Sequence, residues 1–260
     1  MPIITLTTDL GLKDFYLAAV KGFILSSLPD ARIVDVTHHI PSYHITQAAF
    51  ILGNAYHYFP EGTVHLVSVD NSYEPSPKFV AVKANGHYFI GPDNGLFSLF
   101  LKAEEIEKIV KINLRILDDY IHFPIKDILV KSAVHLAKGG NMEFLGRKIN
   151  HLNVKTIIQP VVDPDQIRGS IIYVDSFKNA ITNITRDLFE SVSKGRKFTI
   201  LFKRSETVDK ISLQYSDVLE GEKLCLFGIT GYLEIAINKG EASSLLGLHT
   251  GEAIIVQFNK

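Results

Sequence analysis

The chain has 260 residues, of which 46% are hydrophobic and 21% are charged, so it can bury an ordinary globular core without disulfides or a structural metal. Its formal net charge of −1 provides no basic excess for a phosphate backbone, which disfavours nucleic acid as a partner. The single cysteine, Cys225, lies in an apolar run and is expected to be a buried core residue.

No basic stretch followed by a long apolar segment opens the chain, and no apolar run reaches the roughly 20 residues that span a bilayer. A chain with one cysteine cannot form an internal disulfide, which suits a reducing compartment. We therefore expect a soluble, cytoplasmic protein that makes no contact with a membrane.

The first 155 residues alternate strand and helix patterns, which is typical of an open α/β sheet. Short β-branched runs predict strands, and longer segments with helical spacing of apolar residues predict helices. In chain order we expect strand 3–8, helix 14–28, strand 32–36, helix 45–58, strand 63–69, strands 79–84 and 87–91, and helix 127–138. Asn85-Gly86 predicts a tight hairpin, and Asp14 is a candidate N-cap of the first helix.

The pattern changes after a proline-containing stretch at 157–166, which indicates a crossover or a domain boundary. Beyond it, short strands are expected at 169–175, 197–202, 211–215, 223–228, 232–237 and 253–258, with helices only at 185–193 and 241–246. Regular short strands are typical of a small barrel or sandwich. We predict an α/β domain with a mainly parallel sheet over residues 1–156 and a smaller β-barrel domain over residues 166–260.

Four polar clusters lie at strand ends, where open α/β sheets place their ligands. They are Thr7-Thr8-Asp9-Leu10-Gly11 with Asp14, Asp70-Asn71-Ser72, Pro92-Asp93-Asn94-Gly95, and Asp175-Ser176-Phe177-Lys178-Asn179 followed by Thr182-Asn183. Each cluster alone fits helix capping or turn chemistry. Three acidic clusters at successive strand ends together favour a ligand with vicinal hydroxyls or a cationic group.

Several familiar motifs are absent from the sequence. A Gly-x-Gly-x-x-Gly turn after the first strand and a Gly-rich loop ending in Lys-Ser/Thr are both missing, which disfavours dinucleotides and nucleoside triphosphates. There is also no Gly-x-Ser-x-Gly elbow. The histidines lack the spacing of a metal site, so we expect no metal.

A series of short segments forms a further pattern: ITLTTDLG at 4–11 with Asp14 and Lys21-Gly22, IVDVTH at 33–38, FPEGTV at 59–64, Val69-Asp70, GPDNGL at 91–96, DSFKN at 175–179, TNI at 182–184 and GYLEIA at 231–236. Taken in order, these segments resemble the S-adenosylmethionine (SAM) hydroxide adenosyltransferases, a family related to the bacterial fluorinase and chlorinase. Any one of them is weak, but their order and spacing extend over nearly the whole chain.

The resemblance implies an α/β domain followed by a β-barrel domain, assembled as a homotrimer with each site between one subunit's N-terminal domain and a neighbour's C-terminal domain. It implies that water attacks the ribose 5′ carbon of SAM and releases adenosine and methionine. SAM is then the substrate, and no separate cofactor is expected.

The resemblance also assigns roles to individual positions. Asp9 matches the carboxylate that binds the ribose hydroxyls, Asp14 and Asp175 match groups facing the methionine ammonium, and Asp70 matches a group that holds the attacking water. The remaining expected substrate contacts are Phe177 and Asn179 at the adenine, the backbone of Ala242 at the base, and Asp93 with Asn94 in the third cluster.

The chain departs from the family at three places. The family's arginine position holds Pro77, with Lys78 adjacent, and its histidine position holds Pro124, with His122 as the nearest histidine. Lys78 and His122 are therefore the expected partners of Asp70. The third change puts Gly228-Ile229 where the family has Asn-Ser, which alters the expected contact with the methionine carboxylate.

Three alternatives stay open at this point. A protein that binds SAM or adenosine without turnover needs the same ribose, ammonium and adenine contacts. A halogenating enzyme needs a small desolvated halide pocket, for which Ser72 and Ser76 are the available hydroxyls. A purely structural protein would have no affinity for a nucleoside.

Overall fold

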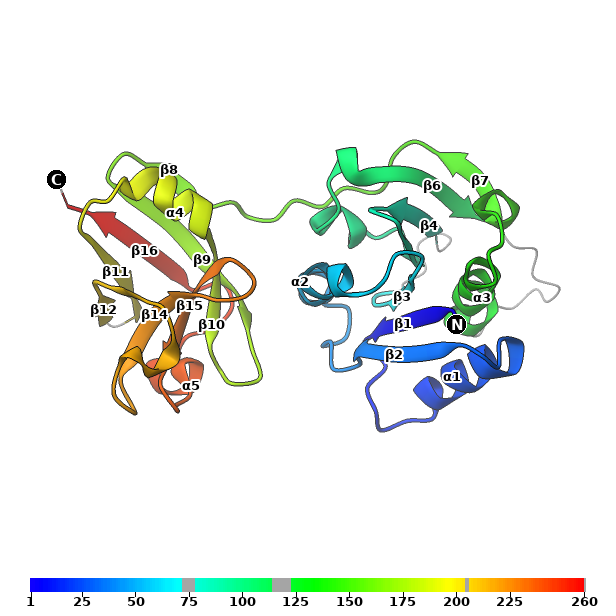
Figure 1. The fold of residues 1–260 in the computed structure, drawn as a ribbon, viewed down its shortest axis with the longest axis horizontal. Helices are drawn as coiled ribbons and strands as arrows, with labels where there is room; N and C mark the ends of the chain where they lie inside the picture. The colour runs from blue at the N-terminus through cyan, green and yellow to red at the C-terminus, as the bar shows by residue number, and fades with distance from the viewer. Residues whose placement is uncertain (72–77, 114–122, 204–205, 260) are drawn as a thin grey trace. The chain divides into compact units, whose positions relative to one another are not determined.

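The computed structural model of the 260-residue chain describes residues 1–71, 78–113, 123–203 and 206–259. The chain divides into two compact units, Met1–Ile157 (unit 1) and Ile158–Lys260 (unit 2) (Figure 1). His122, Ser72, Ser76 and Pro77, named above as candidate or altered positions, lie outside the described residues. Among the helices of the described residues, none is long and apolar enough to cross a membrane.

Unit 1 is built on a seven-stranded sheet in the order β2-β1-β3-β5-β4-β6-β7. The strands are β1 (Ile3–Thr8), β2 (Arg32–Thr37), β3 (Val64–Ser68), β4 (Phe79–Ala84), β5 (His87–Pro92), β6 (Ile106–Ile112) and β7 (Gly146–Ile149). β2, β1, β3 and β5 pair in parallel, whereas β4 is antiparallel to β5 and β6, and β7 is antiparallel to β6. The carboxyl ends of β1 and β3 therefore lie side by side.

Helices cover both faces of this sheet. They are α1 (Tyr16–Ser27), α2 (Ile45–Ala55) and α3 (Lys131–Ala137), with short turns η1 (Tyr56–Tyr58), η2 (Phe97–Leu99), η3 (Ala103–Glu105), η4 (Ile125–Val130) and η5 (Met142–Leu145). α1 and α3 share one apolar core with Phe79 and Ala81 of β4, while α2 shares the other core with Val80 and Val82. The alternation along β4 places successive side chains on opposite faces, as a strand buried on both sides requires.

The expected hairpin at Asn85-Gly86 is confirmed: β4 and β5 pair across it, and both residues have positive φ values, 50° and 76°. Such angles suit a two-residue turn that follows the twist of its strands. β6 and β7 were not predicted, because lysine and glutamate interrupt the apolar pattern of β6 and β7 is only four residues long.

The predicted cap of the first helix is wrong. α1 begins at Tyr16, its N-cap is Phe15, and no side chain caps it. Asp14 lies before the helix and is exposed. The helix is held instead by Leu17, Val20 and Ile24, which are spaced at helical intervals and buried in the core.

Unit 2 is a nine-stranded sheet in the order β12-β11-β16-β9-β10-β15-β14-β13, with β8 paired to β9. The strands are β8 (Val161–Asp163), β9 (Gln166–Val174), β10 (Ala180–Thr185), β11 (Phe198–Phe202), β12 (Glu206–Val208), β13 (Ile211–Ser212), β14 (Lys223–Phe227), β15 (Tyr232–Ile237) and β16 (Ala253–Phe258). The helices are α4 (Arg186–Ser193) and α5 (Ala242–Leu246), with the turn η7 (Tyr215–Asp217).

This second sheet curls into a nearly closed barrel. The edge strand β12 lies next to β14 near the other end of the strand order, and an ion pair between Glu206 and Lys223 joins them. Cys225 on β14 is completely buried in the barrel core, which confirms its expected role, and burial raises the pKa of its thiol.

The sequence analysis missed three strands of unit 2, which are β8, β10 and the three-residue strand β12. β8 lies inside the proline-containing stretch that was interpreted as a boundary, and β10 contains Thr182 and Asn183, which were interpreted as site residues. Asn183 is buried and serves the fold: its Oδ1 accepts the N–H of Ser170 at 2.8 Å, and its Nδ2 donates to the carbonyl of Ile158 at 2.8 Å.

The core of unit 1 contains an uncharged histidine pair. His65 is fully buried; its Nδ1 lies 2.8 Å from the Thr5 hydroxyl, and its Nε2 lies 3.2 Å from Nδ1 of His87. Its ring stacks on Phe89, with centroids 5.0 Å apart. Burial first, and then the neighbouring His87, lower the pKa of His65 from 6.5 to about 3.

This pair makes the stability of unit 1 depend on pH. Between pH 6.5 and about 3 the unfolded chain binds a proton at residue 65 that the folded chain refuses, so the free energy of unfolding falls as the pH falls. Each pH unit in that window removes up to about 1.4 kcal/mol through this one residue. His65→Gln should flatten the dependence of unfolding free energy on pH between 7.5 and 5, measured by chemical denaturation.

The matched control for this prediction is His151→Gln, because His151 belongs to the same unit and is exposed. That variant should keep the slope of the parent protein. An unchanged slope in His65→Gln would show that the acid sensitivity arises elsewhere.

Candidate functional site

Asp9 connects the ends of three segments of unit 1. It follows β1, and its Oδ2 accepts the backbone N–H of Asp70 at 3.3 Å and that of Tyr43 at 3.1 Å. Its own N–H donates to the Ser68 carbonyl at the end of β3, at 3.3 Å. Oδ1 has no hydrogen-bond partner within the described part of the chain. One carboxylate oxygen thus organises the site, and the other remains able to accept from a ligand.

Asp70 has a strained backbone at the end of the β3 segment. Its φ is 53°, in the left-handed region that non-glycine residues rarely adopt. Such a conformation costs on the order of 1 kcal/mol or more and persists where the surroundings impose it. Here Asp9 holds the N–H of Asp70, and Nδ2 of Asn94 donates to the carbonyl of Asp70 at 3.1 Å and to that of Val69 at 3.0 Å.

Tyr43 is a contact that the sequence analysis missed. Its φ is 67° and its side chain is exposed, while its backbone N–H donates a hydrogen bond to Asp9. No local motif marks it, because the contact spans residues 9 and 43 and depends on how the loop before α2 returns to β1. Asn94 was expected in the site, and the structure places it on the backbone of Asp70.

Asp93 has a different environment from Asn94. Its Oδ1 accepts the N–H of Asn153 at 2.8 Å, its backbone N–H donates to the Lys78 carbonyl at 2.8 Å, and Asn153 also bonds the Asp93 carbonyl. Burial raises the pKa of Asp93, although the Asn153 hydrogen bond and the charge of Lys78 oppose the rise. These contacts join the loop that carries Asp93 to Asn153 near the end of unit 1. One oxygen of the Asp93 carboxylate is therefore used in holding the fold together.

Lys78 thus lies beside Asp93 at the start of β4, and its side chain is exposed. Asp14 is exposed as well, and within the described residues its side chain has no hydrogen-bond partner. The structure does not bring Asp14 into the hydrogen-bonded group formed by Asp9, Asp70 and Asn94.

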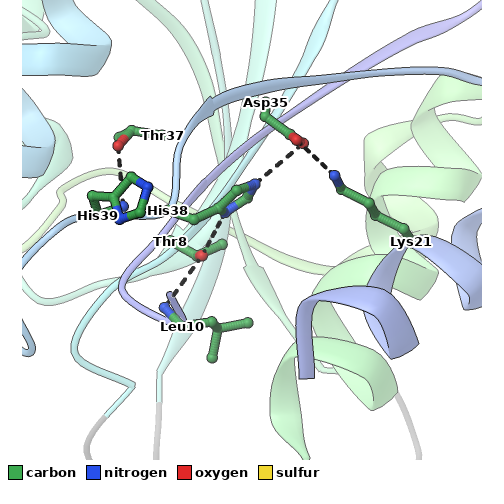
Figure 2. Close-up of polar contacts among 7 residues, drawn as sticks. All are labelled: Thr8, Leu10, Lys21, Asp35, Thr37, His38 and His39. Carbon is green, nitrogen blue, oxygen red and sulfur yellow. Dashed lines mark hydrogen bonds and ion pairs between the residues drawn. The ribbon is translucent and has the colours of Figure 1, made fainter. Parts of the chain in front are cut away.

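A chain of polar contacts approaches the same turn from the surface (Figure 2). Lys21 on α1 donates to Asp35 on β2 at 2.6 Å, and Nε2 of His38 lies 3.1 Å from the other oxygen of Asp35. Nδ1 of His38 lies 2.8 Å from the hydroxyl of Thr8, which accepts the N–H of Leu10 at 3.3 Å. Burial would raise the pKa of Asp35, but the contacts with Lys21 and His38 outweigh it and lower the pKa overall.

In unit 2, the expected substrate residues converge on one turn between β9 and β10. Both oxygens of Asp175 accept from Asn179: Oδ1 from its backbone N–H at 2.8 Å and Oδ2 from its amide at 3.1 Å. The turn residue Lys178 has a φ of 66°, and its carbonyl accepts the N–H of Ser243 at 2.8 Å. Ser243 follows Ala242, the first residue of α5, so the turn and the helix start are bonded together.

The side chains of this turn differ sharply in exposure. Asn179 is buried, whereas Phe177 at the tip is 78% exposed. The ring of Phe177 is therefore available to a flat ligand or to another chain.

Glu234 is a second acidic residue of this region that the sequence analysis did not assign. It is 5% exposed, and the Tyr215 hydroxyl donates to its Oε1 at 2.6 Å. Burial raises the pKa of Glu234; the Tyr215 hydrogen bond opposes the rise and the charge of Asp175 adds to it. A Cβ at Gly228 would lie 2.8 Å from its Oε2, so this position accommodates glycine in place of the family's asparagine.

Each unit therefore offers its own set of polar groups to a ligand. Unit 1 presents a carboxylate anchored between parallel strand ends and a second carboxylate on strained backbone. Unit 2 presents a carboxylate, a buried amide and an exposed aromatic ring in one turn. Taken by itself, unit 1 offers carboxylates that suit hydroxyl groups or a positive charge, and unit 2 by itself offers groups that suit a positive charge or a planar ring.

The comparisons with known proteins cover both units. Residues 4–146 match the SAM hydroxide adenosyltransferase N-terminal domain, and residues 169–255 match the C-terminal domain of the same family. A (R)-S-adenosyl-L-methionine hydrolase from Methanocaldococcus jannaschii is 31% identical over 95% of this chain and 93% of its own length. A fluorinase from Actinopolyspora mzabensis is 24% identical over 98% of this chain and 97% of its own length.

A solved structure supports the same relationship. The crystal structure of an uncharacterized conserved protein from Thermotoga maritima superposes with a TM-score of 0.88 at 32% identity, covering 98% of this chain and 99% of that one. With both domains matched and both kinds of relative aligned over nearly their full lengths, the chain belongs to the SAM hydroxide adenosyltransferase family.

Proposed function

We propose that this chain hydrolyses SAM at the ribose 5′ carbon and releases adenosine and methionine. The observation that carries the proposal is the hydrogen-bonded group of Asp9, Asp70 and Asn94, which fixes two carboxylates at the ends of parallel strands. The hydrolase name of the Methanocaldococcus jannaschii relative supports turnover over binding alone.

In this proposal Asp9 binds the ribose. Its Oδ2 is committed to backbone N–H groups, and its Oδ1 accepts hydrogen bonds from the vicinal hydroxyls. Asp70 holds the attacking water and accepts its proton, with Lys78 and His122 as its proposed partners. The backbone of Asp70 is held on both sides, by Asp9 at its N–H and by Asn94 at its carbonyl, so the point from which its side chain extends is fixed.

The chemistry makes modest demands on the protein. The bond that breaks joins C5′ to a sulfonium sulfur, which leaves with the electron pair as a neutral thioether, so it requires no proton donor. Water supplies the new C5′–O bond and loses one proton. The main contributions are alignment of the water with the breaking bond and exclusion of bulk solvent, and a general base adds about 10²- to 10⁴-fold. SAM and water are the only small molecules that the proposal requires.

We assign the rest of the substrate to unit 2 and to Asp14. Asp175 and Asp14 face the methionine ammonium, the exposed ring of Phe177 packs on the adenine, and the amide of Asn179 with the backbone of Ala242 bonds its edge. The convergence of Asp175, Asn179 and Ala242 on one turn supports this assignment.

The direct test is incubation of the purified protein with SAM, followed by chromatography of the products with and without added halide. Adenosine and methionine should appear in proportion to the protein, and halide should change neither their amounts nor their identity. A halogenated nucleoside would favour the fluorinase-like reaction instead. Binding of intact SAM without any product would favour the non-catalytic alternative.

Asp70→Asn should lower kcat by about 10²-fold or more while the KM for SAM stays within a few-fold, because the variant keeps the shape of the side chain and loses the base. Steady-state kinetics with SAM measures both constants. Asp163→Asn is a suitable control, since Asp163 is a carboxylate of β8 in unit 2 that pairs with Arg168 of the neighbouring strand β9. An Asp70→Asn variant with an unchanged rate would remove Asp70 from the mechanism.

We also propose that the protein assembles as a homotrimer, in which unit 1 of one copy and unit 2 of a neighbour serve the same substrate molecule. Large apolar side chains are exposed on both units: Leu12 is 61% and Phe15 70% exposed on unit 1, and Leu213 is 90% and Ile229 89% exposed on unit 2. Where such side chains gather into a patch, they favour contacts with other chains.

Sedimentation equilibrium should therefore give a mass three times that of the 29.0 kDa chain. Phe15→Glu should shift the distribution toward smaller species, because a charge at an apolar contact is poorly solvated. A parent protein that sediments as a monomer at micromolar concentration would contradict both the trimer and the shared site.

A further inference from the structure

We propose that His38, held by Asp35 and Lys21, is a positioning residue that sets the turn carrying Asp9. The inference rests on the proposed function, because Asp9 is the carboxylate assigned to the ribose. It adds a group that never touches the substrate but decides where the ribose-binding carboxylate lies. The contacts that carry it are drawn in Figure 2.

Burial distinguishes this chain of contacts from an ordinary surface ion pair. Lys21 and Asp35 are partly exposed, but the His38 side chain is 3% exposed and Thr8 is completely buried. The contacts therefore run from a charged pair at the surface to a buried hydroxyl beside Asp9. A buried hydroxyl and imidazole need partners, because an unpaired buried polar group loses the hydrogen bonds that water would give it.

The charges determine which atoms carry protons. The carboxylate of Asp35, kept ionised by Lys21, can only accept, so Nε2 of His38 is the ring nitrogen that carries a proton toward it. The 3.1 Å approach of Nε2 to Asp35 does not meet strict hydrogen-bond geometry, and its contribution is the electrostatic attraction between carboxylate and ring N–H. In the tautomer protonated at Nε2 alone, Nδ1 is an acceptor, and the Thr8 hydroxyl donates to it at 2.8 Å.

This proton order leaves the lone pairs of the Thr8 oxygen for the backbone. They accept the N–H of Leu10 at 3.3 Å, and the carbonyl of His38 accepts the N–H of Gly11 at 3.0 Å. His38 thus holds the turn twice, once through Thr8 before Asp9 and once through Gly11 after it. Because the backbone is held on both sides of Asp9, the position of the Asp9 side chain is restricted.

The order of residues resembles an acid–histidine–hydroxyl triad, but the geometry excludes a nucleophile. Thr8 has no exposed surface, and its oxygen is already occupied by His38 and Leu10. A substrate carbon could not reach it. Positioning is the role that remains for these contacts.

The variant that tests the proposal is Thr8→Val, which keeps the shape of the side chain and removes the hydroxyl. It should raise the KM for SAM by about tenfold with a much smaller change in kcat, and Thr8→Ser should restore the KM. Thr5→Val is the matched control: Thr5 lies on the same strand, is equally buried and bonds His65 through its hydroxyl at 2.8 Å. It should lower stability and leave the KM unchanged.

A double-mutant cycle separates positioning from general destabilisation. If Thr8 acts through Asp9, then Thr8→Val should add little to the KM already raised by Asp9→Asn, so the two effects are not additive. His38→Gln, measured alone and with Asp9→Asn, should follow the same pattern. Fully additive effects, or an equal KM change in Thr5→Val, would overturn the proposal.

Hydrogen exchange of the backbone keeps this test independent of catalysis. The segment containing Leu10 and Gly11 should lose protection in Thr8→Val and keep it in Thr5→Val, as read by mass spectrometry. If the parent protein neither binds nor cleaves SAM, the proposed function fails, and hydrogen exchange alone tests whether His38 and Thr8 hold the turn. Lost protection in Thr8→Val supports that role, and retained protection overturns it.

Discussion

The carboxylate of Asp9 is the contact on which the site of unit 1 depends. One of its oxygens accepts two backbone N–H groups from segments that are 34 and 61 residues away in the chain. Those segments meet only because β1 and β3 are parallel neighbours in register, with Thr8 opposite Ser68. The position of Asp70, its left-handed backbone and the contact from Asn94 all follow from that adjacency.

Buried histidines serve two different purposes in the same sheet. His65 bonds a threonine of β1 and is surrounded by aromatic rings, so burial keeps it neutral and its effect is on stability. His38 also bonds a threonine of β1, but its other nitrogen faces a carboxylate that reaches the surface. Thr5 and Thr8 are three residues apart on β1 and therefore point to opposite faces of the sheet. One strand thus carries both a core contact and a site contact.

Unit 2 arranges its candidate groups by a different principle. A single turn between antiparallel strands holds Asp175 and Asn179 against each other, and the start of α5 is bonded to the same turn. Glu234 on the neighbouring strand β15 adds a buried acid whose pKa is raised beside Asp175. The geometry of one turn is therefore sufficient to bring these groups of unit 2 together. The residues of the unit 1 site meet only because a crossover connection makes distant strands parallel neighbours.

The sequence alone determined the strand and helix order of the first half of unit 1, the Asn85-Gly86 hairpin, the curled sheet of unit 2 and the family. Local periodicity and turn chemistry carry those features. It missed β10 because Thr182 and Asn183 are polar, although the sheet buries and satisfies them. It also assigned a helix cap to Asp14, which lies outside α1.

Only the tertiary structure decided the contacts that cross between segments. No local motif connects the residues that these contacts join. They are the hydrogen bonds from Tyr43 and Asp70 to Asp9, the hydrogen bond between Asn153 and Asp93, and the contact between His38 and Thr8. Their geometry depends on which strands become neighbours and on how far each side chain is removed from water. Hydrogen-bond partners and pKa values are properties of that packing, so they emerge only when the chain is folded.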